Sequence, residues 1–261
     1  MDLNLRGKHA LVGGSSKGIG KAAAIELAAL GADVTLMARS ADLLELVKQE
    51  LDHSQGQTHD YLVVDFTDSD DLRDKVRALA EKKTIHILVN NTGGPPSGPI
   101  IEAQPAQFLS AFHNHLICNH ILVQAVVPGM TASGYGRIIN VVSTSVKSPI
   151  DNLGVSNTTR GAVGNWAKTL ANELGPRGIT VNNVLPGATH TERLAQLLEQ
   201  WGAAKGLTAE QQAENMKAGI PLRRFAEPQE LGAAVAFLAT PAAAYITGTN
   251  LVVDGGRTKM L

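Results

Sequence analysis

The hydrophobic and polar positions of the chain alternate between short apolar runs and longer segments with helical spacing. Seven apolar runs predict buried strands, because each is short and bounded by glycine, proline or polar residues. Between these runs, apolar residues recur every three or four positions, which predicts amphipathic helices. The strands are expected at residues 9–12, 33–38, 60–64, 85–89, 137–142, 179–185 and 250–253.

The helical segments separate these strands almost without exception. A proline in a helix removes a backbone donor, so the fourth segment is expected to break near Pro128. The segment 191–216 is polar and is also expected to be helical. The helices are expected at residues 19–30, 40–52, 69–82, 104–131, 156–174, 191–216 and 228–239.

Strands that alternate with helices along the whole chain indicate a parallel sheet with right-handed crossovers. We therefore expect an α/β fold: a doubly wound, Rossmann-type sheet of about seven strands with helices on both faces. No linker or shift in composition divides the chain, so residues 1–261 are expected to form a single dinucleotide-binding domain.

Composition excludes several classes of function. Hydrophobic residues make up 44% of the chain and the formal net charge is −1, so a nucleic-acid partner is not expected. Cys118 is the only cysteine, which rules out an intrachain disulfide. His113, His115 and His120 do not share one helix face, and no metal site is expected. No signal peptide or membrane span is recognised, and a cytoplasmic protein is expected.

A glycine-rich turn joins the first predicted strand directly to the first predicted helix. It reads Gly-Gly-Ser-Ser-Lys-Gly-Ile-Gly over residues 13–20. In this position the backbone N–H groups at the helix N-terminus can face a pyrophosphate, and the glycines allow close approach. The expected cofactor contacts in this turn are Gly14, Ser16, Lys17, Gly18, Ile19 and Gly20.

The end of the second strand indicates which dinucleotide is bound. NAD-binding domains of this type usually carry an acidic residue there, which contacts the ribose hydroxyls. This chain has Arg39 instead, and Lys17 adds a second cation in the glycine-rich turn. A guanidinium can pair with a 2′-phosphate, so the sequence predicts NADP(H).

The Gly-x-x-x-Gly-x-Gly spacing of this turn resembles the short-chain dehydrogenase/reductase family, and in particular its 3-oxoacyl-ACP reductases. Further segments carry the same resemblance: Asn90–Gly93, Pro186-Gly187, and residues 245–248 and 253–256. It implies a homo-oligomer, a dimer or tetramer, that acts on a small molecule. It also implies cofactor contacts at Asp65, Phe66, Asn91, Thr92, Gly93, Arg160, Pro186, Gly187 and Thr191.

The resemblance fails at the catalytic positions. Ser143 matches the family serine that polarises the substrate carbonyl. The family tyrosine and lysine, spaced Tyr-x-x-x-Lys, fall on Ser156 and Arg160. The family asparagine falls on His115, or on Asn114 if the register slips by one residue. We therefore expect a catalytic set of Ser143, Ser156, Arg160 and His115.

These replacements change the expected chemistry. A serine hydroxyl is far less acidic than a phenol, so Ser156 is a poor general acid at neutral pH. Arg160 stays charged and cannot relay protons, although it can hold a ribose and stabilise an oxyanion. The proton could instead come from His115, from His190, or from a water held by Ser143 and Ser156.

Three functions remain compatible with this sequence. The first is an NADP(H)-dependent reductase of a carbonyl or similar electrophile, with a remodelled acid. The second is a catalytically silent sensor or partner protein that binds NADP(H). The third is a reductase of an acceptor that needs no strong acid, such as a quinone. In each enzymatic case, residues 191–219 are expected to form a substrate lid.

Overall fold

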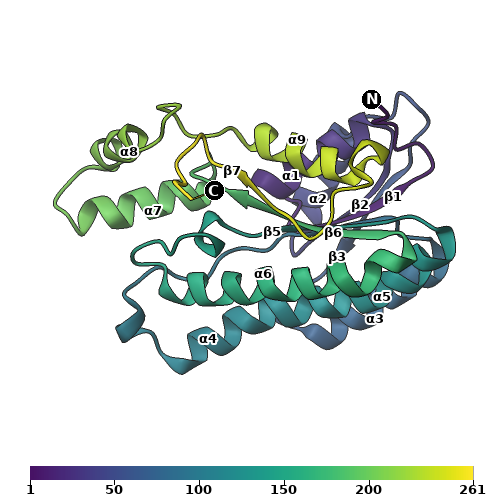
Figure 1. Ribbon diagram of the computed structural model, residues 1–261, viewed down its shortest axis with the longest axis horizontal. Helices are drawn as coiled ribbons and strands as arrows, with labels where there is room; N and C mark the ends of the chain where they lie inside the picture. Colours follow the sequence, from purple (N-terminus) through teal and green to yellow (C-terminus); the bar gives the residue numbers. More distant parts are fainter. Residues whose placement is uncertain (261) are drawn as a thin grey trace.

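The computed structural model describes residues 1–260 of the chain. Seven parallel strands form one sheet between layers of helices (Figure 1). The strands are β1 (His9–Gly13), β2 (Asp33–Ala38), β3 (His59–Val63), β4 (Ile87–Asn90), β5 (Gly136–Val141), β6 (Ile179–Pro186) and β7 (Asn250–Val253). The predicted fold class is confirmed.

The helices follow the predicted periodicity, and the expected lid segment is divided into two of them. They are α1 (Gly18–Ala29), α2 (Ala41–Glu50), α3 (Ser69–Lys82), α4 (Pro105–Phe112), α5 (Cys118–Ser133), α6 (Gly154–Leu174), α7 (Glu192–Ala203), α8 (Ala209–Ala218) and α9 (Pro228–Ala239). The lid segment thus contains two separate helices, α7 and α8, which pack against each other (Figure 1).

The strand order is β3-β2-β1-β4-β5-β6-β7, and all neighbouring strands are parallel. The chain builds the sheet outward from β1 to β3 and then returns to build it from β4 to β7. The order therefore reverses between β1 and β4. In open α/β sheets, ligands bind at the carboxyl ends of the strands beside such a switch point.

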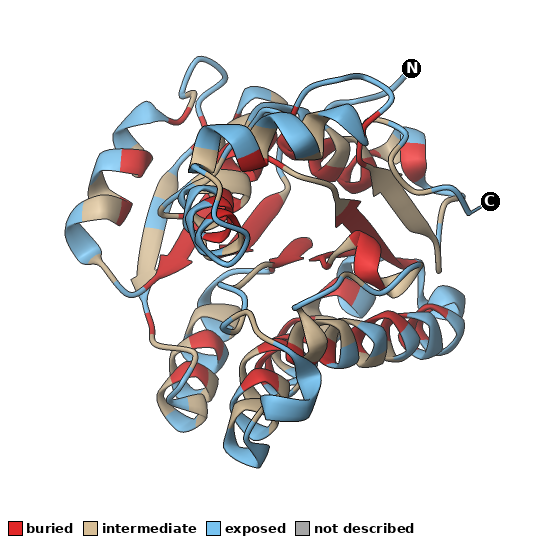
Figure 2. Ribbon diagram, turned by 90° about the vertical axis from the view of Figure 1, so that its left-hand side faces the viewer, coloured by how far each residue is buried: buried red, intermediate tan, exposed pale blue. Residues whose placement is uncertain are grey.

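Two apolar cores hold the helices on the sheet (Figure 2). On one face, α1, α2 and α9 pack through fully buried residues such as Leu27, Leu44 and Leu231. On the other face, α3, α5 and α6 pack through a second cluster that includes Leu72 and Leu122. The central strands β1, β4 and β5 between them are fully buried, which explains why their sequences are mainly apolar.

Pro128 does not break the helix, and that prediction was wrong. Helix α5 continues through Pro128 to Ser133. Pro128 and Gln124 both face solvent, so water can satisfy the Gln124 carbonyl that the proline leaves without a donor. The helical segment is instead distorted earlier, by one π-helical turn at His113–Ile117 between α4 and α5. Such turns occur frequently at functional sites.

The helical run Pro105–Ser133 is long and apolar enough to span a membrane by length and composition alone. Within the protein, its α5 part lies against α3 and against the sheet. Cys118, Leu122 and Val126 of this helix belong to the core beneath the sheet. This position accounts for its apolar character, because a helix that covers a parallel sheet needs a wide apolar face.

Four asparagine side chains form a ladder across β4, β5, β6 and β7. Asn90 donates to Asn140 at 2.8 Å, Asn140 to Asn183 at 2.9 Å, and Asn183 to Asn250 at 2.8 Å. These residues are direct partners in the strand register. The ladder satisfies polar groups inside the sheet and fixes the register of the strands that carry the site.

Candidate functional site

The glycine-rich turn is shaped to let a ligand approach the N-terminus of α1. Gly14 and Gly18 have φ angles of 56° and 55°, which favour glycine. A Cβ on Gly20 would collide with the Gly14 carbonyl and lie 2.7 Å from the side-chain nitrogen Nδ2 of Asn91. Helix α1 has no side-chain cap and no acidic residue in its first turn. Its free N–H groups therefore suit a phosphate.

Neighbouring strands hold this turn in place. The Asn91 side chain donates to the carbonyls of Gly13 and Gly14 at 3.2 and 3.3 Å. On the other side, the Met37 amide donates to the buried Ser15 hydroxyl at 2.8 Å. The role of Ser15 could not be predicted from the sequence, because its partner is a backbone group of a different strand. The turn is therefore fixed from both β4 and β2.

The two cations expected near the adenosine end of a dinucleotide are placed differently. Arg39 is exposed at the end of β2. The pKa of the nearby Asp65 carboxyl is lowered mainly by a hydrogen bond from the Thr67 backbone, and to a smaller extent by the charge of Arg39. Lys17 instead pairs with Glu192 of α7 at 2.9 Å. Lys17 thus connects the glycine-rich turn to the lid, a contact that sequence reasoning did not anticipate.

A cavity of about 610 Å³ opens at the carboxyl ends of β4, β5 and β6. It joins the glycine-rich turn to the expected catalytic residues on α6. The expected site residues that line it are Gly14, Lys17, Gly18, Ile19, Asn91, Thr92, Gly93, Ser143, Ser156, Arg160, Pro186, Gly187 and Thr191. Ser16, Gly20, Arg39, Asp65, Phe66 and His115 do not line it.

Three of the four expected catalytic residues meet in this cavity. Ser143 follows β5 and caps a short 3-10 turn, where its hydroxyl accepts from the Ser145 amide at 3.1 Å. Ser156 lies in the first turn of α6, and Arg160 follows one turn later. Arg160 donates from Nη1 to the Val141 carbonyl at 2.9 Å. This bond fixes the guanidinium at the end of β5.

Burial affects the charge of Arg160 without removing it. Desolvation and, to a smaller extent, the nearby charge of Arg193 together lower the pKa of its guanidinium to about 10. A group with that pKa remains protonated at neutral pH. Arg160 is therefore a fixed cation in the cavity and does not exchange protons near pH 7.

His115 lies beneath the cavity, in the π-helical turn. Its side chain is 3% exposed, and Nδ1 lies 2.6 Å from the Thr92 hydroxyl. Burial lowers the pKa of His115 to about 2, with a smaller effect from Arg160. The imidazole is therefore neutral at physiological pH, which does not support the expected role as the acid. Asn114 is the alternative at this position, and neither residue lines the cavity; His115 is connected to it through Thr92, which does.

His190, the other histidine considered as a proton donor, lines the same cavity as Ser143 and Arg160. Its side chain is half exposed, and its ring packs against Phe225 with centroids 5.3 Å apart. Its Nε2 lies 3.8 Å from a carboxylate oxygen of Glu227. Among the residues that the structure describes, no group of three or more His, Cys, Asp or Glu side chains could hold a metal ion.

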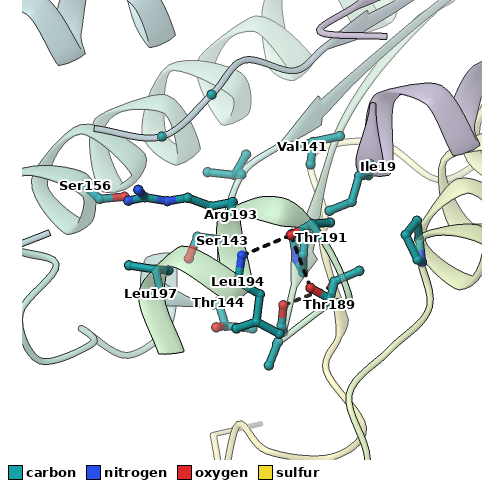
Figure 3. Close-up of a pocket in the computed structure, with 18 of the residues that line it drawn as sticks. Ile19, Val141, Ser143, Thr144, Ser156, Thr189, Thr191, Arg193, Leu194 and Leu197 are labelled. Atoms are coloured by element: carbon teal, nitrogen blue, oxygen red, sulfur yellow. Dashed lines mark hydrogen bonds between the residues drawn. The ribbon is translucent and has the colours of Figure 1, made fainter. Parts of the chain in front are cut away.

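The lid contributes a residue that the sequence did not single out. Thr191 caps α7, accepting from the Leu194 amide at 3.3 Å (Figure 3). Arg193 follows in the first turn of α7, and its side chain extends toward Ser156 (Figure 3). Its Nη2 donates to the Pro95 carbonyl at 2.6 Å. No motif marks Arg193, because its importance depends on how α7 folds back over the cavity.

Comparisons with known proteins agree with this architecture. Residues 14–258 match the family model described as enoyl-(acyl carrier protein) reductase. The chain is 34% identical over 258 residues to the 3-oxoacyl-(acyl-carrier-protein) reductase FabG of Vibrio cholerae, covering 97% of this chain and 98% of that protein.

Solved structures show the same fold over the full length. L-sorbose reductase of Gluconobacter frateurii, solved with NADPH and L-sorbose, is 31% identical and aligns with a TM-score of 0.92 over 100% of both chains. YwfH, described as an NADPH-dependent reductase involved in bacilysin biosynthesis, is 28% identical, with a TM-score of 0.91 over 97% of this chain and 99% of YwfH. The chain therefore belongs to the short-chain dehydrogenase/reductase family, whose members are oxidoreductases that use a nicotinamide cofactor.

Proposed function

We propose that this protein is an NADP(H)-dependent reductase of a carbonyl or similarly electrophilic small molecule, with a remodelled catalytic set. The observation that carries the proposal is the single cavity that joins the glycine-rich turn to Ser143, Ser156 and Arg160. A cofactor and a small substrate would meet there, because the turn suits phosphate and the other end carries hydrogen-bond donors.

The preference for NADP(H) rests on Arg39. It follows β2 at the position where an acidic residue would contact an unphosphorylated ribose. Its exposed guanidinium is free to pair with a 2′-phosphate. L-sorbose reductase and YwfH, which share the fold, are both described with NADPH.

The chain's own residues would bind and polarise the substrate, while the bound nicotinamide supplies the hydride. Ser143 donates a hydrogen bond to the carbonyl oxygen. Arg160 stabilises the negative charge that develops on that oxygen, because its guanidinium is anchored and stays protonated. Both groups are in place before the reaction, so little reorganisation is needed.

The proton that completes the alcohol would come from solvent. Ser156 is much smaller than a tyrosine, which leaves room for a water between Ser156 and Ser143. The two hydroxyls hold and orient that water, and its proton passes to the oxyanion. Neutral His115 supports this arrangement from below by positioning Thr92.

The lid and the assembly complete the proposal. Residues 191–219, with α7 and α8, would cover the substrate. Leu194 and Leu198 of this segment pack with Ile220 and Phe225, which follow it, in a small core separate from those of the sheet, as suits a substrate lid. We also infer one domain, a cytoplasmic location and a homo-oligomer, a dimer or tetramer. The exposed apolar residues Leu109 and Ile117 support the oligomer.

The test combines NADPH binding with turnover. The protein is titrated with NADPH and then assayed against ketones, aldehydes and quinones. We expect turnover that falls by about a hundredfold in Ser143→Ala and in Arg160→Gln, because each removes a donor to the developing charge. Ser148→Ala is the matched control, since Ser148 is exposed and does not line this cavity.

The outcomes separate the three functions. Turnover of ketones or aldehydes supports the reductase with a remodelled acid. Turnover of quinones alone identifies an acceptor that needs no strong acid. NADPH binding without any turnover identifies a silent sensor or partner protein and contradicts the proposed activity.

A further inference from the structure

Two arginines face the same cavity, and neither has a carboxylate partner. Arg160 donates to the Val141 carbonyl, and Arg193 donates to the Pro95 carbonyl. No ion pair in the described part of the chain includes either of them. One backbone bond each leaves most of their N–H donors available to a ligand.

The cavity is positively charged although the chain as a whole is not. Lys17, Arg160, Arg193 and Arg257 line it, and Glu192 is the one carboxylate among the lining residues. Glu192 is already paired with Lys17. The formal net charge of the chain is −1, so this excess of cations is a local feature. Such an excess favours an anionic ligand.

The two guanidiniums also disfavour each other. Burial lowers the pKa of both, and the charge of Arg193 further lowers that of Arg160. Arg193 lies in the first turn of α7, where the helix dipole adds positive potential. Bringing two unpaired cations together in a partly buried site costs free energy. An anion that binds between them would recover that free energy.

The position of Arg193 separates this anion from the phosphates of a dinucleotide. The phosphate-binding features lie at the glycine-rich turn, between β1 and α1. Arg193 extends the other way, toward Ser156 at the start of α6 (Figure 3). The charge is therefore directed at the place where the reacting carbonyl would lie, next to Ser143.

The remaining walls on this side are apolar. Leu197 and Trp201 of α7, with Ile150, Leu153 and Met216, line the same cavity. A ligand that fits this arrangement has an anionic head and an apolar body. Carboxylate suits the planar fork of an arginine, which can form two parallel hydrogen bonds with it.

We propose that the substrate is an oxo acid, whose carboxylate is one or two carbons from the reducible carbonyl and is bound by Arg193 together with Arg160. This inference rests on the proposed function and narrows its substrate class. In the reaction, the carbonyl carbon accepts a hydride from NADPH, and its oxygen accepts a proton from the bound water, which regains a proton from solvent. The products are the hydroxy acid and NADP⁺, and the carboxylate is unchanged.

Binding to the NADP⁺-saturated protein tests the proposal without turnover. Pyruvate, acetoacetate and phenylpyruvate are titrated by calorimetry, each beside its methyl ester. We expect at least one acid, with phenylpyruvate favoured by the apolar walls, to bind about tenfold or more tightly than its ester. Arg193→Gln should abolish this preference, and Arg193→Lys should restore part of it, because the lysine keeps the charge but not the fork.

Two controls separate the substrate from the cofactor. Arg177→Gln removes an exposed arginine that does not line the cavity, and it should leave the preference unchanged. The affinity of Arg193→Gln for NADP⁺ should match that of the wild type. A loss of NADP⁺ affinity as large as the loss of acid affinity would assign Arg193 to the cofactor and overturn the proposal.

The proposal is also overturned if none of the acids binds, or if acids and esters bind equally well. A failure of the proposed function would look different. In that case NADP⁺ itself does not bind, and the free protein is titrated with the same acids. If the free protein prefers the acids over their esters and this preference depends on Arg193, the carboxylate site is supported. If it shows no such preference, the carboxylate site is contradicted.

Discussion

Arg160 retains one part of what a lysine at its position provides and loses another. Its guanidinium is anchored on the Val141 carbonyl and stays charged, so it can stabilise an oxyanion or hold a ribose. It cannot release a proton at neutral pH, and Ser156 offers only a weakly acidic hydroxyl. The sequence predicted these two consequences from residue type alone, because they depend on chemistry rather than on placement.

Restoring the family pair should therefore restore a general acid. We expect Ser156→Tyr with Arg160→Lys to raise kcat/KM for a neutral ketone by about a hundredfold, with a pH profile that reports the new phenol. Ser156→Phe with Arg160→Lys is the matched control, because it adds the ring without the hydroxyl. An equal gain in the control would assign the effect to filled volume.

Arg39 should set the cofactor preference. Arg39→Asp is expected to weaken NADPH binding by about tenfold or more and to strengthen NADH binding, since a carboxylate repels a 2′-phosphate and accepts from ribose hydroxyls. Fluorescence titration with both nucleotides measures this change. Arg77→Asp, at an exposed position on α3, controls for the change in net charge. Equal wild-type affinity for NADPH and NADH would contradict the assignment.

Other residue contacts could not be read from the sequence. Lys17 was expected as a second cation that favours NADP(H), and it pairs with Glu192, which is 175 positions away. Arg193 reaches the cavity only because α7 returns over it. Both contacts depend on tertiary structure between distant segments, and neither local spacing nor a motif records such contacts.

At the scale of elements, periodicity predicted nearly everything. All seven strands were located to within about two residues, because each is a short, mainly apolar run between polar segments. The errors arose where a local rule was overridden. Solvent tolerates Pro128 inside α5, and the π-helical turn at His113–Ile117 has no pattern of its own in the sequence.

The packing of α9 on α1 gives a test of these elements. A Cβ on Gly232 would lie 2.8 Å from the backbone carbonyl of Ala22, so Gly232→Ala must push the two helices apart. We expect a loss of about 1–3 kcal/mol in the free energy of unfolding. Chemical denaturation measures it.

Gly161→Ala is the matched control on α6. Gly161 is exposed and has no atom within 4 Å of the position of an added Cβ. The same substitution should therefore stabilise the protein by about 0.5–1 kcal/mol, through helix propensity. If both variants change stability in the same direction, α9 does not pack on α1 as described.

At the scale of the whole molecule, two buried histidines make stability depend on pH. Burial lowers the pKa of His9 from 6.5 to about 4 and that of His115 from 6.5 to about 2. Above pH 6.5 both are neutral in the folded and unfolded chains. Below it the unfolded chain binds protons that the folded protein does not, so stability falls as the pH falls.

Between pH 7.5 and pH 5.5 we expect the free energy of unfolding to fall by about 3 kcal/mol from these two groups together. Denaturation curves at the two pH values measure this difference. His115→Asn should remove about half of it, whereas His120→Asn, at an exposed position, should leave it unchanged. An undiminished pH difference in His115→Asn would show that His115 is protonated in the folded protein.

In the asparagine ladder across β4, β5, β6 and β7, the effect of a substitution at one position depends on the residues at the other three. An apolar residue in place of Asn140 would strand two amide partners in the interior, a cost of about 1–3 kcal/mol for each group left without a hydrogen bond. Replacing all four together would strand none. The effects of single substitutions along the ladder should therefore not add, and each asparagine is retained because of the others. During evolution such a ladder can be lost without a stability cost only if several asparagines are replaced together. This mutual dependence therefore conserves the alignment of the strands beneath the site.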